Sequence, residues 1–144
     1  MLLPKKKPSA VIGIDTGVKT GFAKWIPAEN KLTVIMTYSI DWAMLVVKDN
    51  ALFYDFDILV RVEDARQANY GRQNDAHRAR GAGSVMRDAK IWQDFLTREK
   101  IPFEMVRPRK QFTKWPADVF NRFTGWKGRT TSHGRDAAML VYGY

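Results

Sequence analysis

Three short apolar runs separated by turn residues open the chain. The runs occupy residues 11–14, 21–26 and 32–36, and the third alternates apolar with polar positions. Turn-forming residues fill positions 17–20 and 27–30 between them. Strands joined by such short turns pair antiparallel, so this part of the sequence predicts a three-stranded meander.

Helical and strand patterns alternate in the rest of the chain. The expected elements are a helix over 42–50 capped by Asp41, a strand over 58–62, a helix over 85–96 capped by Ser84, a strand over 101–106, a short helix over 116–123, and a last helix capped by Ser132 or a neighbouring threonine. The polar, arginine-rich stretch 64–83 is expected to be a loop or mobile extension. A strand reached through a helix is usually parallel to its neighbour. The pattern therefore predicts an α/β fold with a five-stranded mixed sheet, its first three strands antiparallel and helices on both faces.

The length of 144 residues suits one domain, which we place at 9–144 after a basic, disordered tail at 1–8. No apolar run approaches the roughly eighteen residues of a membrane helix, so no membrane contact is expected. The chain has no cysteine, which excludes disulfides and thiolate metal sites and fits a reducing compartment such as the cytoplasm.

Basic residues exceed acidic ones, and the excess lies in the later part of the chain. Residues 1–57 hold seven Lys and Arg against six Asp and Glu, whereas residues 58–144 hold seventeen against nine. Two groups stand out: Arg66, Arg72, Arg78 and Arg80, and then Arg107, Arg109, Lys110 and Lys114. Such groups favour nucleic-acid binding through release of counterions. A solvated basic surface is the alternative.

Acidic residues stand at the ends of two predicted strands. Asp15 ends the first strand and Glu63 ends the fourth. If these strands are parallel neighbours, both carboxylates emerge at the edge of the sheet where α/β folds bind their ligands. Asp136 follows His133 by three residues in the last helix, so both lie on one helical face. If that helix meets the strand ends, three carboxylates and an imidazole converge.

Clustered carboxylates need a positive partner to stay ionised together, and a hard divalent cation such as Mg²⁺ or Mn²⁺ provides it. Two such ions about 4 Å apart activate water and neutralise charge on a phosphodiester. Each acid also has a simpler explanation. Asp15 could cap a turn, and Glu63 could form an ion pair with Arg61 or Arg66. Asp136, in the first turn of its predicted helix, could interact favourably with the positive end of the helix dipole.

These residues, in this order, resemble the RuvC-type Holliday junction resolvases of the ribonuclease H-like superfamily. The matching segments are VIGIDTGVKTGFA, VRVEDAR, RARGAGSVMRDAKIWQDFL, VRPRKQFTK and SHGRDAAML, which together span nearly the whole chain. The resemblance implies a ribonuclease H-like fold and a metal-dependent endonuclease that resolves Holliday junctions by paired symmetrical nicks.

The resemblance also implies a set of site residues. Two magnesium ions would be held by Asp15, Glu63, His133 and Asp136. Some members have Asp in place of His133, so its role as a ligand or as an adjacent acid–base group stays open. A lysine after the fifth strand, Lys110 or Lys114, would contact the scissile phosphate or a metal-bound water.

The partners implied are branched DNA and a second copy of the chain, because such resolvases work as two-fold dimers with the central helix near the contact. Tyr70, in the loop after Glu63, could stack on an unpaired base at the junction centre. Gly81 and Gly83 precede a helix and could allow close helix approach or hold a phosphate at its N-terminus. Two other functions remain: another ribonuclease H-like nuclease acting on flaps, RNA–DNA hybrids or an rRNA precursor, or a non-catalytic binding module whose acids are structural.

Overall fold

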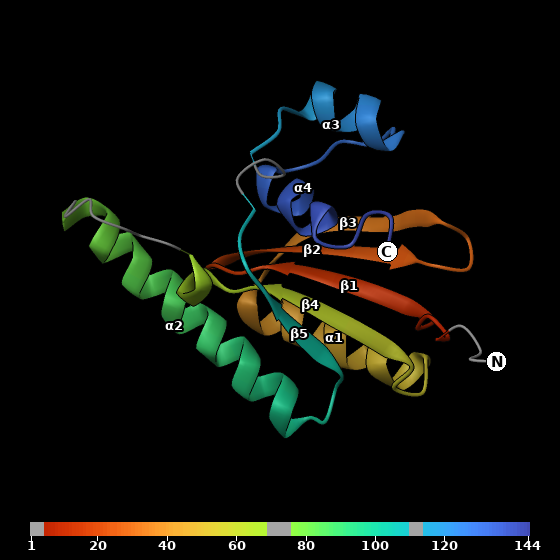
Figure 1. The fold of residues 1–144 in the computed structure, drawn as a ribbon, viewed down its shortest axis with the longest axis horizontal. Coiled ribbons are helices and arrows are strands. Elements are labelled where there is room, and N and C mark those ends of the chain that lie inside the picture. The colour runs from red at the N-terminus through yellow and green to blue at the C-terminus, as the bar shows by residue number, and fades with distance from the viewer. Residues whose placement is uncertain (1–4, 69–75, 110–113) are drawn as a thin grey trace.

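A single mixed sheet forms the centre of the molecule (Figure 1). The computed structural model describes residues 5–68, 76–109 and 114–144, with backbone alone for 76–82 and Val85. The strands are β1 (Ala10–Asp15), β2 (Lys19–Ile26), β3 (Lys31–Ser39), β4 (Ile58–Glu63) and β5 (Phe103–Val106). Their order is β3-β2-β1-β4-β5. The pairs β1–β2 and β2–β3 are antiparallel and β1–β4 and β4–β5 parallel, which confirms the predicted mixed sheet.

Helices cover both faces of this sheet. They are α1 (Ile40–Phe53), the 3-10 turn η1 (Ala65–Gln67), α2 (Ala76–Arg98), α3 (Ala117–Thr124) and α4 (Ser132–Met139). Figure 1 shows α1 and α2 on one face and α4, with α3 outside it, on the other. All six residues of β1 are buried, as expected for a central strand whose two faces are both covered.

Each face has its own hydrophobic core. On the first face, Ile12, Ile14 and Phe22 of the sheet pack with Trp92 and Leu96 of α2. On the second, the core comprises Val11, Ala23, Trp25, Leu32, Ile35, Phe120, Ala137, Ala138 and Val141. Alternate side chains of β1 therefore serve the two cores, because successive strand residues point to opposite faces. No helix among the described residues is long and apolar enough to span a membrane.

Two predicted helix starts are wrong. Helix α1 begins at Ile40 with Ser39 as its N-cap, so Asp41 lies in the first turn. An acid in the first turn also favours the helix dipole, which is why the sequence did not distinguish the two positions. Helix α2 begins at Ala76, so residues 76–83 are helical and Ser84 lies inside the helix. The predicted loop therefore covers part of a helix, and Gly83 is not at a helix N-terminus.

The last helix starts as one of the two predicted alternatives. The Thr131 hydroxyl caps α4 by accepting a hydrogen bond of 3.0 Å from the Gly134 amide. Thr131 also shares a short hydrogen bond with Thr37 of β3. The cap thus fixes the N-terminus of α4 to the sheet as well as satisfying its amide.

Candidate active site

The carboxylates that end β1 and β4 lie at the same edge of the sheet. The parallel register pairs Ile14 with Val62, so Asp15 and Glu63 follow at equivalent positions on neighbouring strands. Asp15 is buried, with 8% of its surface exposed. The parallel pairing expected for the first and fourth strands therefore places both acids at the carboxyl ends, as α/β folds place their ligand sites.

Two glycines let α4 approach these strand ends. A Cβ atom on Gly21 would lie 2.0 Å from the carbonyl oxygen of His133, and one on Gly13 would lie 2.1 Å from that of Ala137. Real Cβ atoms do not approach backbone this closely, so only glycine permits the contact. Gly21 pairs with Asp15 across β1 and β2. The backbone of α4 therefore rests directly on the sheet beside Asp15.

This docking brings His133 to Asp15. His133 Nδ1 lies 3.1 Å from Asp15 Oδ2, a hydrogen-bond distance. The pKa of Asp15 is raised to about 6. Burial is the main cause, the hydrogen bond to His133 opposes it, and the negative charge of Asp136 contributes to the rise. Asp15 thus does not serve mainly as a turn cap. Its described partner comes from a helix distant in sequence.

Glu63 is the third acid of the group. The pKa of Glu63 is raised to about 7, mainly by burial and in addition by the negative charges of Asp15 and Asp136. Neither predicted arginine partner neutralises it. Arg61 pairs with Glu104 at 3.2 Å, while Arg66 pairs with Asp64 at 2.8 Å. The simpler explanation of Glu63 as an ion-pair partner of these arginines is therefore wrong.

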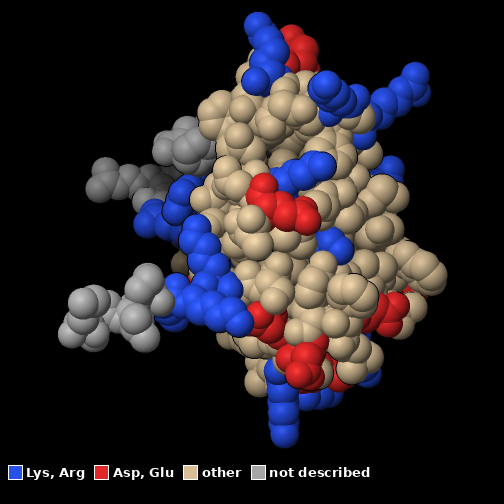
Figure 2. Space-filling model, turned by 90° about the vertical axis from the view of Figure 1, so that its right-hand side faces the viewer, with Lys and Arg blue, Asp and Glu red and all other residues tan. Residues whose placement is uncertain are grey.

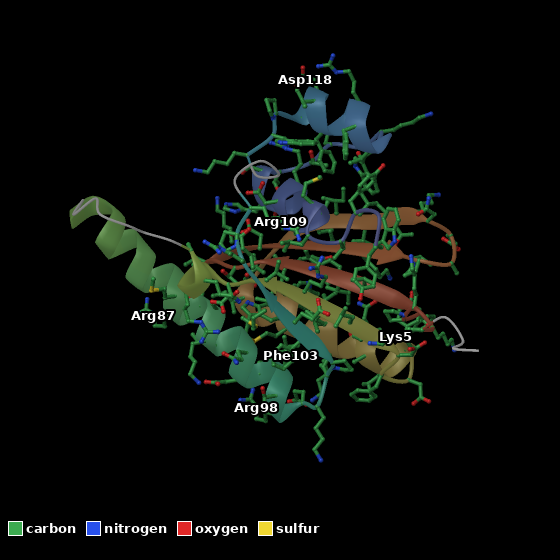
Figure 3. The ribbon with its side chains drawn as sticks, in the orientation of Figure 1. Lys5, Arg87, Arg98, Phe103, Arg109 and Asp118 are labelled. Atoms are coloured by element: carbon green, nitrogen blue, oxygen red, sulfur yellow. The ribbon has the colours of Figure 1, made fainter. Side chains whose placement is uncertain are left out.

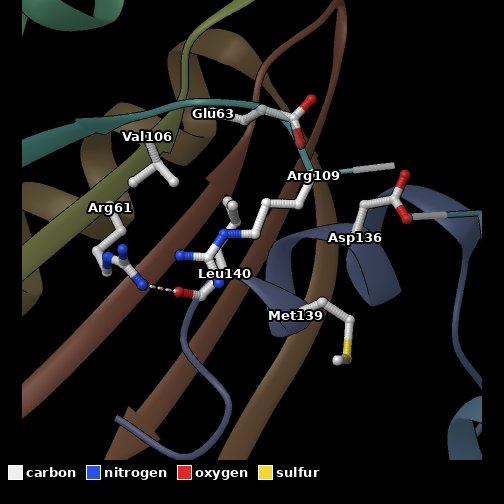
Figure 4. Close-up of a pocket in the computed structure, with 7 residues that line it drawn as sticks. All are labelled: Arg61, Glu63, Val106, Arg109, Asp136, Met139 and Leu140. Atoms are coloured by element: carbon white, nitrogen blue, oxygen red, sulfur yellow. Dashed lines mark hydrogen bonds between the residues drawn. The ribbon is translucent and has the colours of Figure 1, made fainter. Parts of the chain in front are cut away.

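Glu63 and Asp136 line a small pocket between β4, the chain after β5, and α4 (Figure 4). Its other lining residues are Arg61, Val106, Arg109, Met139 and Leu140. Figure 4 shows the Arg109 side chain running away from the two carboxylates toward Leu140, whose carbonyl accepts a hydrogen bond of 2.5 Å from Arg61. Asp136 accepts a hydrogen bond of 2.9 Å from the backbone amide of Lys114. The pocket therefore combines two carboxylates with two arginine side chains, Arg61 and Arg109.

We call the group of Asp15, Glu63, His133 and Asp136 the acid site. The acid site suits a hard cation by its chemistry but not by its present arrangement. Three carboxylates in mutual repulsion, two of them with raised pKa values, form an oxygen-rich set of the kind that Mg²⁺ and Mn²⁺ favour. Within residues 5–68, 76–109 and 114–144, however, no three acidic or histidine side chains are close enough to hold an ion together. Asp15 and Asp136 hydrogen-bond to protein groups instead. The oxygen donors therefore fit a hard cation. The Asp15 and Asp136 side chains would have to rotate away from their hydrogen bonds to bind it.

The predicted DNA-binding residues and the two candidate lysines lie in different parts of the structure. Arg107 and Arg109 are exposed at the end of β5, and Figure 3 shows Arg109 between that strand and α4. Arg78 and Arg80 belong to α2, where the structure describes only backbone. Tyr70, Arg72 and the candidate catalytic Lys110 lie outside the described residues. Lys114 is exposed beside Asp136.

Arg66 lies at the surface, but its guanidinium is engaged by other protein groups. Its Nε and Nη2 atoms donate to the two oxygens of buried Asp64 at 2.8 and 3.0 Å, and Nη2 also donates to Gln93 of α2 at 2.7 Å. Burial alone would raise the pKa of Asp64, but hydrogen bonds from Arg66 and Gln67 outweigh it and lower that pKa. This clamp fixes the turn after Glu63 to α2. DNA contact by Arg66 stays a prediction.

Lys and Arg are concentrated along one border of the face shown in Figure 2, although others lie elsewhere on it. Figure 2 views the side on which the N-terminus lies in Figure 1. Lys and Arg run in a band along its left border, while Asp and Glu gather near its centre and lower rim. A basic band of this kind is consistent with binding to a polyanion.

The sequence did not reveal two features of the site. The sequence does not reveal that Gly13 and Gly21 let α4 pack directly on the sheet. Both glycines lie inside strands, between residues that are expected to be buried. A glycine inside a strand often marks close approach of another backbone, and this signal was available. The sequence predicts Arg109 to be on a DNA-binding surface and gives no indication that it borders the acidic pocket.

Comparison with solved structures identifies a similar fold. T. thermophilus RuvC in complex with Holliday junction substrate matches with a TM-score of 0.53 and 14% sequence identity, over 92% of this chain and 90% of that chain. No protein-family model matches the sequence, and no curated protein matches it. At this identity the likeness concerns the fold. It confirms the expected ribonuclease H-like, RuvC-type architecture.

Proposed function

We propose that this protein is a divalent-metal-dependent endonuclease that resolves Holliday junctions. The observation that carries the proposal is the meeting of Asp15, Glu63 and Asp136, from two parallel strands and one helix, closely enough for their charges to perturb one another. A folded protein brings three acids together against their repulsion at a cost in stability, and functional sites are where such costs concentrate.

Asp15, Glu63 and Asp136 would hold the metal, with His133 as a fourth ligand or as the group that orients Asp15. When bound, Mg²⁺ or Mn²⁺ supplies activation of water and neutralisation of charge on the phosphodiester. The protein's own groups prepare the site. His133 holds one oxygen of Asp15, and the Lys114 amide holds one oxygen of Asp136. Glu63 must lose its proton before it can act as a ligand.

Arg109 supports phosphate binding at the same place. Its guanidinium borders the pocket that Glu63 and Asp136 line, where it could pair with a phosphate oxygen of the entering strand. Lys114, exposed beside Asp136, and Lys110 are the two lysines that we propose for contact with the scissile phosphate. The anionic strand would then meet cations at the rim of a site whose centre is acidic.

The proposed substrate is supported by the fold and by charge. RuvC, whose fold this chain shares, is bound to a Holliday junction in the matching structure. The excess of seventeen basic over nine acidic residues after position 57 suits a polyanion. Paired symmetrical nicks require two active sites, so we propose that the protein acts as a homodimer with two-fold symmetry.

The test is cleavage of a synthetic four-way junction, a flap and a linear duplex, each with Mg²⁺ and with chelator. We expect symmetrical nicks in the junction alone, and only with metal. Glu63→Gln should bind the junction without cutting it, whereas Glu29→Gln, a matched change in the exposed turn before β3, should cut normally. Equal cutting of all three substrates would contradict junction selectivity. No cutting in Mg²⁺ or Mn²⁺ would contradict the enzyme itself and favour a binding module.

A further inference from the structure

A second concavity lies beside the acid site, on the other side of His133. This groove has a volume of roughly 590 Å³, and its walls include Val18, Lys19, Tyr38, Ser132 and His133. That volume falls within the range of about 300–1,000 Å³ typical of ligand sites. None of the functions assigned above uses it.

The sheet order separates the groove from the acidic pocket. The groove lies over β2, β3 and the N-terminus of α4, whereas the pocket lies over β4, β5 and the C-terminal half of α4. In the order β3-β2-β1-β4-β5, β1 lies between the two, and Asp15 ends that strand. His133 borders the groove and contacts Asp15. A nucleic-acid strand that lies across the carboxyl ends of the β-strands would therefore cross the pocket, then Asp15, then the groove.

The groove combines one cation with apolar and hydroxyl surface. Lys19 is exposed at its rim, and the described residues that line the groove include no Asp or Glu. Val18, in the turn between β1 and β2, is 77% exposed and presents an apolar surface at the groove. Tyr38 is held against Phe22, with ring centroids 5.7 Å apart, so its ring forms a fixed wall. Ser132 adds an exposed hydroxyl.

These surfaces match the parts of a nucleotide. A phosphate suits a lysine and a hydroxyl, while the sugar and base present apolar faces that suit Val18 and Tyr38. We propose that the groove binds the nucleotide next to the cleaved phosphodiester on the cut strand. This inference rests on the proposed function, because it needs a strand that crosses the acid site. It adds a binding site for substrate on the β3 side of that site.

A charge series at the rim gives the first test. Val18→Glu should weaken binding of the four-way junction about five- to tenfold in chelator, and Val18→Lys should strengthen it, because only the sign of the added charge differs. Lys19→Ala should reduce the slope of log affinity against log salt by about one. Lys31→Ala is the matched control, since Lys31 is exposed at the opposite end of the same β2–β3 pair. It should leave the slope unchanged.

Cross-linking gives the second test, because the chain has no cysteine. The Val18→Cys variant therefore has one thiol, at position 18. A junction with a thiol tether one nucleotide from the cut should form a disulfide with this variant and not with Lys31→Cys. A flat charge series with no cross-link at position 18, or equal cross-linking at position 31, would overturn the groove assignment.

These outcomes are distinguishable from failure of the proposed function. If the wild-type protein cuts the junction in Mg²⁺ while the Val18 variants bind like the wild type and do not cross-link, the groove assignment is wrong and the nuclease assignment stands. If the wild type cuts no substrate in Mg²⁺ or Mn²⁺, the nuclease assignment is wrong and the groove assignment is overturned with it.

Discussion

Asp15 and Glu63 hold their protons more tightly than ordinary carboxyl groups. The pKa of Glu63 is raised to about 7 by burial and by the charges of Asp15 and Asp136, and burial is also the main cause that raises the pKa of Asp15 to about 6. Near neutral pH the metal-free protein therefore relieves the repulsion by protonation. A bound cation would relieve it in another way and release those protons.

Replacing Glu63 by Gln should stabilise the metal-free protein at high pH. Because the folded pKa is raised from 4.5 to about 7, the folded state binds more protons than the unfolded state in that window, and stability falls as pH rises through it. Ionisation of a fully buried group with this shift would lower the free energy of unfolding by about 3 kcal/mol. Solvent access reduces the expected loss at pH 8, and hence the gain from Glu63→Gln, to about 1–2 kcal/mol. Urea unfolding in chelator at pH 4 and pH 8 measures it. Equal stability of the two proteins at pH 8 would show that the ionised Glu63 side chain does not destabilise the fold.

Replacing Arg66 by Ala should destabilise the protein. Asp64, 4% exposed, would lose the bidentate guanidinium that neutralises it and keep only the Gln67 side chain and the Arg66 amide. We expect a loss of about 1–3 kcal/mol in the free energy of unfolding. Arg98→Ala is the control, because its side chain is 67% exposed. If Arg66→Ala weakens DNA binding while unfolding like the wild type, Arg66 serves the nucleic acid and the clamp is unimportant.

Helix α4 is the element on which the site depends. It carries His133 and Asp136, and its backbone contacts the sheet at Gly13 and Gly21. The Thr131 cap adds a hydrogen bond to Thr37 of β3. The geometry of the acid site is therefore set by how closely one short helix packs on β1 and β2, as well as by the acids themselves.

Adding one methyl group at Gly21 should separate this helix from the strand ends. The Cβ atom of Gly21→Ala would lie 2.0 Å from a backbone oxygen, so α4 must move. We expect a loss of about 1–3 kcal/mol in stability and roughly a hundredfold loss of junction cleavage. Gly83→Ala is the matched control inside α2, since its Cβ atom would meet nothing within 4 Å. A Gly21→Ala enzyme with normal cleavage would contradict the importance of this contact.

The sequence predicted the elements well where local pattern and tertiary environment agree. The five strands, their directions and the carboxylates at 15 and 63 followed from alternating apolar runs and short turns. The sequence-based prediction failed where the local pattern and the tertiary environment disagree. The first part of α2 extends past the sheet in Figure 1 and has no apolar stripe, so its composition is typical of a loop. The docking of α4 depends on contacts distant in sequence, which local pattern does not encode.

At the scale of the whole molecule, the fold places an acidic centre within a basic protein. The sheet edge gathers acids from β1, β4 and α4, while Arg107 and Arg109 follow β5 at the same edge. DNA would be attracted by the basic excess and repelled by the acids unless a cation offsets them. The proposed metal reconciles these two properties, and a symmetric pair of such molecules would present two sites to a four-branched substrate.

Mixing active and inactive subunits should separate the two cuts. When wild-type protein is mixed with an excess of Glu63→Gln and allowed to exchange subunits, we expect a cruciform plasmid to yield nicked circles in place of linear DNA, because a mixed dimer has one working site. Gel electrophoresis distinguishes the products. If the excess variant only slows the formation of linear DNA, with no rise in nicked circles, the two cuts do not come from paired subunits.

The most direct measurement is crystallographic. Crystals soaked in Mn²⁺ should show anomalous density between Asp15, Glu63 and Asp136, with the carboxylates rotated from their present hydrogen bonds toward the ion. The same soak of Glu63→Gln crystals should show this density reduced or absent. Wild-type crystals without manganese at these residues, at concentrations that support cleavage, would contradict the claim that the three acids form a metal site.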